Sequence, residues 1–239
     1  MTEQTTQKKY ELLKDDTVEH FGRTLYRIKA LVTFGLVGAG QLGGYIETEK
    51  NLDHSGNAWV YDNAMVYGNA RVFGNATVYG NAWVCDTTRV YGNAMVYGNA
   101  RVFGNATVYG NAWVYADAWV YGNARVYGNA RVYGDACVYG DARVYGDAWV
   151  YGDAWVYGNA WVRSFAVISE RKMIFWASNV GSENGTLTVF NGKFGLIVTR
   201  GCFTGTVDEF LSKSKEVHDD KTHHEYKLLI EVAQSRILN

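Results

Sequence analysis

The sequence predicts a mainly β protein: a parallel β-helix of about seven coils, with a β-hairpin cap before it and a small α+β module after it. Valine recurs every six residues from Val60 to Val162 without a miss, and a repeat of this period indicates a parallel β-helix. An alanine stands two residues before almost every one of these valines. The chain has 27 Gly and no Pro, which suits strands that must donate hydrogen bonds to neighbouring coils.

The repeating unit is A-x-V-Y-G-N, in which x varies. Alternation along a strand places Ala and Val on one face, and the variable residue and Tyr on the other. Gly followed by Asn or Asp makes the corner, because these residues tolerate left-handed backbone angles. The variable position holds Arg71, Arg89, Arg101, Arg125, Arg131 and Arg143. Burying these charges without carboxylate partners would be too costly, so Ala and Val line the interior and the aromatic residues face outward.

The repeat, including its opening GNAWVYDNAMVYGNARV, resembles the left-handed parallel β-helix of hexapeptide-repeat proteins, and in particular bacterial and phage proteins of the YdcK type. The likeness covers residues 9–168. It implies left-handed winding and triangular coils, each made of three six-residue units. The segment SNVGSENGTLTVF…TRGCFTGTVDEF resembles the tail of phage- and prophage-encoded members. This resemblance implies a host protein or a host defence signal as the target.

One stretch, NAMVYGNARVFGNATVYGNAWV, occurs at residues 63–84 and again at 93–114. The offset is five units, which is not a whole number of three-unit coils. The second copy should therefore fall on a different face of the triangle. Such a duplication leaves the core unchanged but mixes the side chains on the outer faces.

Three regions follow one another: a hairpin cap over 1–33, the β-helix over 34–168 and the α+β module over 169–239. KYELL, TVEHF and TLYRIKAL predict a hairpin that turns near Gly22. The six-residue register traces backwards from Val60 through Ile46 and Leu42 to Phe34 and Leu36, so we expect the first coil to begin near residue 34. The segment GAGQLGG has no helical pattern after it, which disfavours a nucleotide-binding loop and favours a tight turn into the first coil.

The C-terminal module is predicted from three strands and two helices. KMIFWA, TLTVF and FGLIVTR are typical of strands, the last two joined across Asn191-Gly192. Thr206 and Glu209 have the spacing of a capping box that opens a helix, whose apolar side is Val207, Phe210, Leu211 and Val217. A second helix carries Tyr226, Leu229, Ile230, Ala233 and Ile237 at helical spacing. A unit of this size exceeds what a lid requires, so we expect a specific activity in it.

Composition excludes several classes. Residues 57–165 carry seven Asp and seven Arg, a balance that disfavours nucleic-acid binding. The three cysteines are too widely spaced for a disulfide framework or a zinc site. No apolar signal region or spanning stretch is present, so we expect a cytoplasmic protein without a membrane partner. No cofactor is predicted.

One short segment concentrates residue types that can bind metals: His218, Asp219, Asp220, His223, His224 and Glu225. It lacks a metal-binding His pair at helical spacing, so a solvated turn is the simpler interpretation.

Two sets of candidate site residues follow from the columns of the coil. Stacking every third unit gives a partly basic column of Arg71, Arg89, Thr107, Arg125, Arg143 and Trp161, which suits a small anionic ligand. Arg200 and Cys202, just before a predicted helix N-terminus, are further candidate ligand-binding residues, with a purely structural turn as the alternative.

The aromatic residues that face outward predict a homo-oligomer, a trimer or a dimer, through Trp83, Trp119, Trp155, Tyr121, Tyr139 and Tyr157. The alternative is that these rings only stack neighbouring coils together.

An acyltransferase is the enzyme class that the hexapeptide-repeat resemblance implies, and its general base is a coil histidine. Residues 57–168 contain no histidine, and only His54 is near. The sequence therefore favours a non-enzymatic scaffold that binds its target stoichiometrically, through the C-terminal module or between subunits, with the acyltransferase as the alternative.

Overall fold

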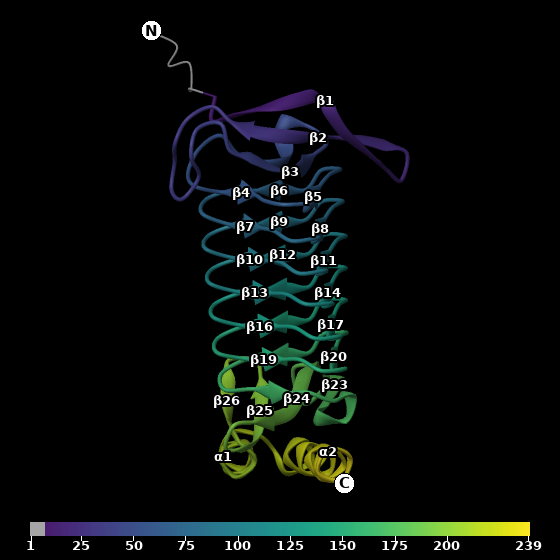
Figure 1. Cartoon of the computed structure of the whole chain (residues 1–239). Coiled ribbons are helices and arrows are strands. Elements are labelled where there is room, and N and C mark those ends of the chain that lie inside the picture. The colour runs from purple at the N-terminus through teal and green to yellow at the C-terminus, as the bar shows by residue number, and fades with distance from the viewer. Residues whose placement is uncertain (1–7) are drawn as a thin grey trace, which may run out of the picture.

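The structure is a computed structural model of the 239-residue chain, and it describes residues 8–239. The molecule is a straight rod with a β cap at one end and an α+β module at the other (Figure 1). A parallel β-solenoid of about seven coils forms the rod, as predicted. No helix in the described residues is long and apolar enough to cross a membrane.

Three parallel sheets form the sides of the solenoid, and from β4 onward neighbouring strands of a sheet are 18 residues apart in the chain, as Val96 and Val114 are. The Trp83 face consists of β3 (Leu42–Ile46), β5 (Met65–Val66), β8 (Trp83–Val84), β11 (Arg101–Val102), β14 (Trp119–Val120), β17 (Cys137–Val138) and β20 (Trp155–Val156). The Trp149 face consists of β4 (Trp59–Val60), β7 (Thr77–Val78), β10 (Met95–Val96), β13 (Trp113–Val114), β16 (Arg131–Val132), β19 (Trp149–Val150) and β22 (Val167–Ile168). The Arg125 face consists of β6 (Arg71–Val72), β9 (Arg89–Val90), β12 (Thr107–Val108), β15 (Arg125–Val126), β18 (Arg143–Val144) and β21 (Trp161–Val162).

The interior contains the residues that the repeat predicts. Every valine from Val60 to Val162 in the six-residue register is fully buried, and so are the alanines two positions before them. Thr88 replaces one alanine and is also buried, with its hydroxyl donating to the carbonyl of Val102 at 3.5 Å. Trp59 was expected to face outward but is fully buried, because Tyr10 and Phe34 of the cap pack against its ring.

Corners between strands depend on a residue in the left-handed region. Gly110 has φ +71°, and a Cβ atom there would lie 3.0 Å from the backbone nitrogen of Gly128 in the next coil. The residue after the glycine makes a ladder along the rod: Asn75, for example, donates from its amide to the Asn93 side-chain oxygen at 3.1 Å. Three such ladders run down the corners, and each donates into an aspartate, which accepts but cannot donate: Asp117, Asp141 and Asp147.

Aromatic side chains at the fourth position of the unit stack from coil to coil. Tyr97 and Tyr115, for example, have ring centroids 4.8 Å apart and planes within 2° of parallel. The same arrangement repeats in all three stacks, so the predicted stabilising role of the aromatic residues between coils is supported by geometry.

The N-terminal cap is a hairpin of β1 (Tyr10–His20) and β2 (Arg23–Ala30), and β2 pairs antiparallel with β3. The first parallel pairing joins Tyr45 to Met65. The coils therefore begin at β3, later than the predicted residue 34. Leu36 and Leu42, which the backward trace placed in the core, are exposed. Leu36 lies in a tight turn between the bridged residues Phe34 and Val37, and Leu42 pairs antiparallel with the cap strand β2 instead of continuing the register. A 3-10 turn, Glu49–Asn51, interrupts the first coil.

The C-terminal module has an antiparallel sheet of β23 (Ile174–Val180), β24 (Gly185–Gly192), β25 (Gly195–Arg200) and β26 (Phe203–Thr206), covered by α1 (Val207–Val217) and α2 (Asp220–Leu238). A 3-10 turn, Arg171–Met173, leads into it. Both predicted helices are present, and the Thr206–Glu209 capping box is formed. The strand β26 was not predicted. The hairpin turns at Lys193-Phe194, two residues beyond the predicted Asn191-Gly192, and Val217 is exposed instead of facing the core.

The module is fixed to the last coil by hydrogen bonds between β24 or β25 and the coil. The Thr199 hydroxyl donates to the Trp161 carbonyl at 2.8 Å, and the Trp161 N–H donates to the Thr188 hydroxyl at 3.2 Å. Phe190 and Ile174 complete the hydrophobic core of the solenoid at this end. The module therefore closes the open end of the rod and keeps a defined position relative to each face.

Candidate functional site

The basic column predicted from the sequence exists on the Arg125 face. Arg71 pairs in register with Arg89, Thr107 stands between Arg89 and Arg125, and Arg143 follows in the next coil. Adjacent coils are about 4.8 Å apart, so Arg89 and Arg125 are about 10 Å apart along the rod, with the short Thr107 side chain between them.

A polar groove of 470 Å³, here called the arginine groove, runs beside this column. The column contributes Arg89, Thr107, Arg125 and Arg143, and a corner ladder contributes Thr87, Asn105, Asn123 and Asp141. The ladder residues bind one another: the Asn105 amide donates to Asn123 at 3.1 Å and the Asn123 amide to Asp141 at 3.0 Å. The groove therefore has three guanidinium groups and one carboxylate at its C-terminal end.

Most other coil arginines already have an aromatic partner. The Arg101 guanidinium lies between the rings of Trp83 and Trp119, 4.5 and 5.0 Å from their centroids. Arg131 lies in the same way between Trp113 and Trp149. These arginines are half-buried.

Arg89 and Arg125 differ from them. Both side chains are exposed, and neither forms an ion pair, a side-chain hydrogen bond or a cation–π contact with residues 8–239. Arg143, at the end of the groove, rests on the Trp161 ring with 4.6 Å to the centroid. The two arginines without a partner are therefore the ones best placed to bind an anion.

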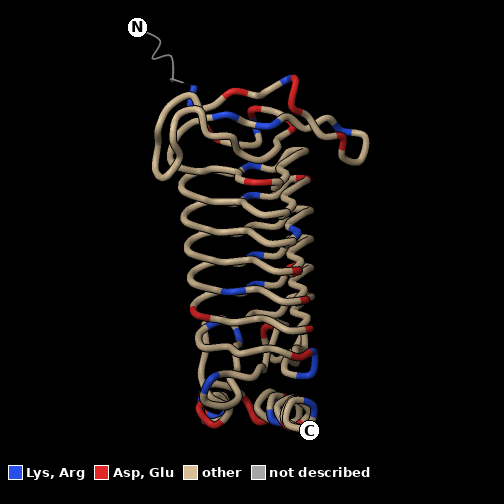
Figure 2. The backbone as a smooth tube through the Cα atoms, in the orientation of Figure 1, with Lys and Arg blue, Asp and Glu red and all other residues tan. Residues whose placement is uncertain are grey.

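The charges of the arginine column affect the pKa of the tyrosines that stack beside it. Burial raises the pKa of Tyr109 and Tyr127, and neighbouring tyrosines add to the rise. Arg125 and Arg143 oppose it, because a nearby cation favours the phenolate form. Along the whole rod, charges of both signs are interspersed (Figure 2).

A second cavity of 370 Å³ continues from the arginine groove toward the C-terminal module, sharing Asp141 and Arg143 with it. Trp161 and Arg200 also line this cavity. The Arg200 guanidinium is held by the Tyr226 hydroxyl at 2.9 Å and the Val180 carbonyl at 3.3 Å, with Glu183 at 3.9 Å. Arg200 therefore stabilises the module, and part of its guanidinium is already occupied by these contacts.

The remaining predicted ligand residues lie outside the arginine groove. Cys202 is exposed beside a separate pocket of 170 Å³ in the module, which Arg200 also lines. Arg71 is exposed beyond the N-terminal end of the groove, with Phe73 5.6 Å from its guanidinium. The structure thus brings together Arg89, Arg125 and Arg143, connects Arg200 to them through the second cavity, and leaves Arg71 and Cys202 apart.

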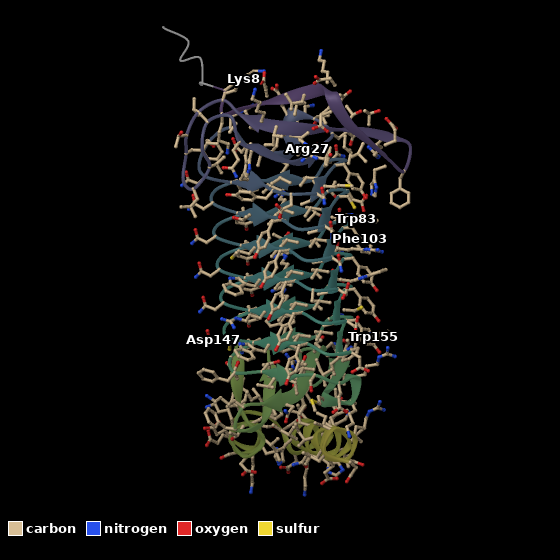
Figure 3. The ribbon with its side chains drawn as sticks, in the orientation of Figure 1. Lys8, Arg27, Trp83, Phe103, Asp147 and Trp155 are labelled. Carbon is tan, nitrogen blue, oxygen red and sulfur yellow. The ribbon has the colours of Figure 1, made fainter. Side chains whose placement is uncertain are left out.

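The predicted interface residues lie in one sheet and one ring stack, but internal contacts cover several of them. The tip of the cap hairpin places His20 and Phe21 against Trp83. Arg171 lies over Trp155, 3.7 Å from its centroid. Trp119 is 39% exposed and Tyr157 is also exposed, whereas Tyr121 and Tyr139 stack within the ring ladder. Figure 3 shows Trp83, Phe103 and Trp155 along this edge of the rod.

His54 belongs to the cap. Its ring stacks on Tyr10 at 4.3 Å, and its Nδ1 accepts the backbone N–H of Lys9 at 3.2 Å. In the C-terminal cluster, Asp219 caps α2 by accepting the Thr222 N–H, and His223 lies within hydrogen-bond distance of the Ser214 hydroxyl. No cluster of potential metal ligands occurs within residues 8–239.

The sequence alone did not predict the groove's polar edge or a second, larger groove of 710 Å³ on the Trp149 face. The signal for both was present in the 18-residue period. Reading Asn105 in steps of 18 gives Asn123 and Asp141, and reading Trp113 in the same steps gives Arg131 and Trp149.

Seven segments of the chain match the family described as YdcK Beta solenoid repeat: residues 58–72, 70–86, 89–102, 100–116, 118–134, 124–140 and 136–152. No curated protein matches the chain. The matching segments cover most of the strands that form the three faces. The repeats that form the solenoid within residues 58–152 are therefore YdcK β-solenoid repeats.

Proposed function

We propose that the protein is a non-enzymatic scaffold that binds an elongated anionic ligand, one per chain, in the arginine groove. The observation that carries this proposal is the contrast between coil arginines: Arg101 and Arg131 are covered by tryptophan rings, whereas Arg89 and Arg125 are exposed and without partners. Exposed guanidiniums at fixed spacing are suited to carboxylate or phosphate groups, which they bind through paired N–H donors.

The geometry favours a ligand with several negative groups along its length. Arg89 and Arg125 are about 10 Å apart and Arg143 lies one coil further, all on the same rigid face. An anionic group over Thr107 would contact two guanidiniums, and the asparagine ladder offers amide N–H groups along the same edge. At the C-terminal end, the Asp141 carboxylate would repel an anion, and the Trp161 ring would receive an uncharged or planar part of the ligand instead.

Two sources of such an anion fit the proposal: a linear polyphosphate or nucleotide phosphate chain, and an acidic segment of a host protein. Thermal-shift measurements with tripolyphosphate and with a hexaglutamate peptide separate them. We expect stabilisation by one of the two, weakened by salt because exposed charges are screened. Arg125→Gln should weaken binding by about tenfold or more, since a charge-assisted hydrogen bond contributes about 1.5–3 kcal/mol.

Arg101→Gln is the matched control, because Arg101 occupies the same position of the unit on another face. Its removal should leave the ligand-induced shift unchanged. If neither anion shifts the melting temperature, or if R101Q and R125Q lose the shift equally, the arginine groove is not the binding site.

A further inference from the structure

The 710 Å³ groove lies on the Trp149 face, where the last coils meet the C-terminal module. Its walls include Trp113, Arg131, Trp149, Phe165 and Lys193. Arg131 covers one side of the Trp149 ring, 5.2 Å from its centroid. The next residue in this column is Val167, which is too small to cover the other side. Trp149 is accordingly 42% exposed.

A protruding aromatic ring stands at the C-terminal end of this groove. Phe194 is 82% exposed on the two-residue turn between β24 and β25. The turn is held against the last coil, because the Lys193 N–H donates to the Phe165 carbonyl at 2.9 Å and Gly192 bridges to Ala166. Phe165 is itself 53% exposed. A rigid, exposed aromatic patch of this kind is typical of an interaction surface.

Two charged side chains without ion-pair partners flank the patch. Asp147 ends an asparagine ladder and accepts the Asn129 amide at 2.9 Å, which leaves its other oxygen atom free. The Lys193 ammonium lies 5.3 Å from the Phe194 ring centroid. Within residues 8–239, neither charge forms a salt bridge. Asp147 projects from the side of the rod just above the C-terminal module (Figure 3).

We propose that this patch binds a second copy of the chain about a two-fold axis. Phe194 of each copy enters the groove beside Trp149 of the other, and Lys193 of each copy pairs with Asp147 of the other. A two-fold interface requires one surface that complements itself. This patch complements itself in two ways: the protruding Phe194 ring lies next to the groove, and the Lys193 ammonium and the Asp147 carboxylate both lie on the same patch.

The orientation of the two rods follows from the position of the ring. Phe194 stands at the C-terminal end of the groove. A two-fold axis parallel to the rod would place the Phe194 ring of each copy opposite that end of the partner's groove, outside it and not beside the partner's Trp149. The axis must therefore be perpendicular to the rod, and the rods overlap antiparallel at their C-terminal ends. The arginine groove lies on a different face and stays open. A stable contact needs about 500 Å² from each copy, so the interface must extend from the groove onto the neighbouring coils and the module.

Light scattering coupled to size exclusion tests the proposal on the full-length protein. We expect twice the chain mass of 26.7 kDa for the wild type. Phe194→Asn should give the monomer mass with an unchanged circular dichroism spectrum. Phe21→Asn is the matched control: Phe21 is 79% exposed on a turn at the opposite end of the rod, and its variant should remain a dimer.

A charge exchange tests the pairing and its reciprocity. Lys193→Glu and Asp147→Lys should each shift the mass toward the monomer at low salt, and the double variant should restore the dimer. A monomeric or trimeric wild type, a dimeric F194N, or a double variant that remains monomeric would each overturn the proposal.

Discussion

At the scale of single residues, the environment of each position follows from two rules: buried arginine is costly, and strand side chains alternate. These rules suffice to predict the buried valines and alanines. They fail at Trp59, which occupies an outward position but is buried under Tyr10 and Phe34. The burial of Trp59 depends on how the cap packs, and no local pattern in the repeat contains that information.

The buried position is tested by charge substitution. Val108→Asp places an unpaired carboxylate in a dry core and should lower the free energy of unfolding by more than about 4 kcal/mol. Tyr109→Ala removes one half-buried ring from a stack and should cost about 1 kcal/mol. Urea denaturation measures both, and equal losses would contradict the assignment of inner and outer faces.

The buried amine of Lys9 predicts a pH dependence of the cap. Its Nζ donates to the Ala58 carbonyl at 2.8 Å. Burial lowers its pKa to about 8, and Asp53 only partly opposes this. The ordinary pKa of a lysine amine is about 10.4. Between about pH 8 and pH 10 the unfolded chain therefore binds more protons at Lys9 than the folded chain does. The contribution of Lys9 to the free energy of unfolding consequently rises with pH in this range.

The measurement is the free energy of unfolding of wild type relative to Lys9→Met, which removes the same titration from both states. The difference should move in favour of the wild type from about pH 7.5 to about pH 9.5. A difference that stays constant over this range would show that the Lys9 amine keeps its ordinary pKa.

At the scale of elements, the solenoid is built from equivalent units, and the duplicated segment shows this directly. Trp83 of the first copy lies on one face and Trp113 of the second lies on another, as the 30-residue offset requires. The residue types typical of turns predicted the position of a hairpin less well than the repeat predicted the coils. Asn191-Gly192 has the composition of a hairpin turn, yet Gly192 pairs with Gly195 and bridges to Ala166, so docking on the last coil moves the turn to Lys193-Phe194. Left-handed winding remains a prediction from the family resemblance.

Equivalence of the coils predicts tolerance to deletion by whole coils. Removing residues 93–110 deletes three units, restores the 18-residue register and should give a folded, shorter rod. Removing 93–98 deletes one unit, preserves the core and rotates the C-terminal module by about a third of a turn relative to the cap. Thermal denaturation followed by circular dichroism compares the two. If only the three-unit deletion folds, the outer faces contribute to folding and the units are not equivalent.

At the scale of the whole molecule, function depends on which columns the three faces expose. The sequence was sufficient to find the arginine column, because a period of 18 residues brings Arg89, Arg125 and Arg143 together. It was insufficient to separate exposed arginines from covered ones, since Arg101 occupies the same position of the unit but lies between two tryptophan rings. Nor could it show that Arg200 is held by Tyr226, a contact between residues in different elements of the module.

The binding of an anion by the arginine groove is tested most directly by isothermal titration calorimetry of the full-length protein with tripolyphosphate and with hexaglutamate at low salt. We predict one binding site per chain for one of these ligands, lost in the double variant Arg89→Gln/Arg125→Gln and retained in Arg101→Gln. Absence of binding heat with both ligands, or equal binding by the double variant and the wild type, would contradict it.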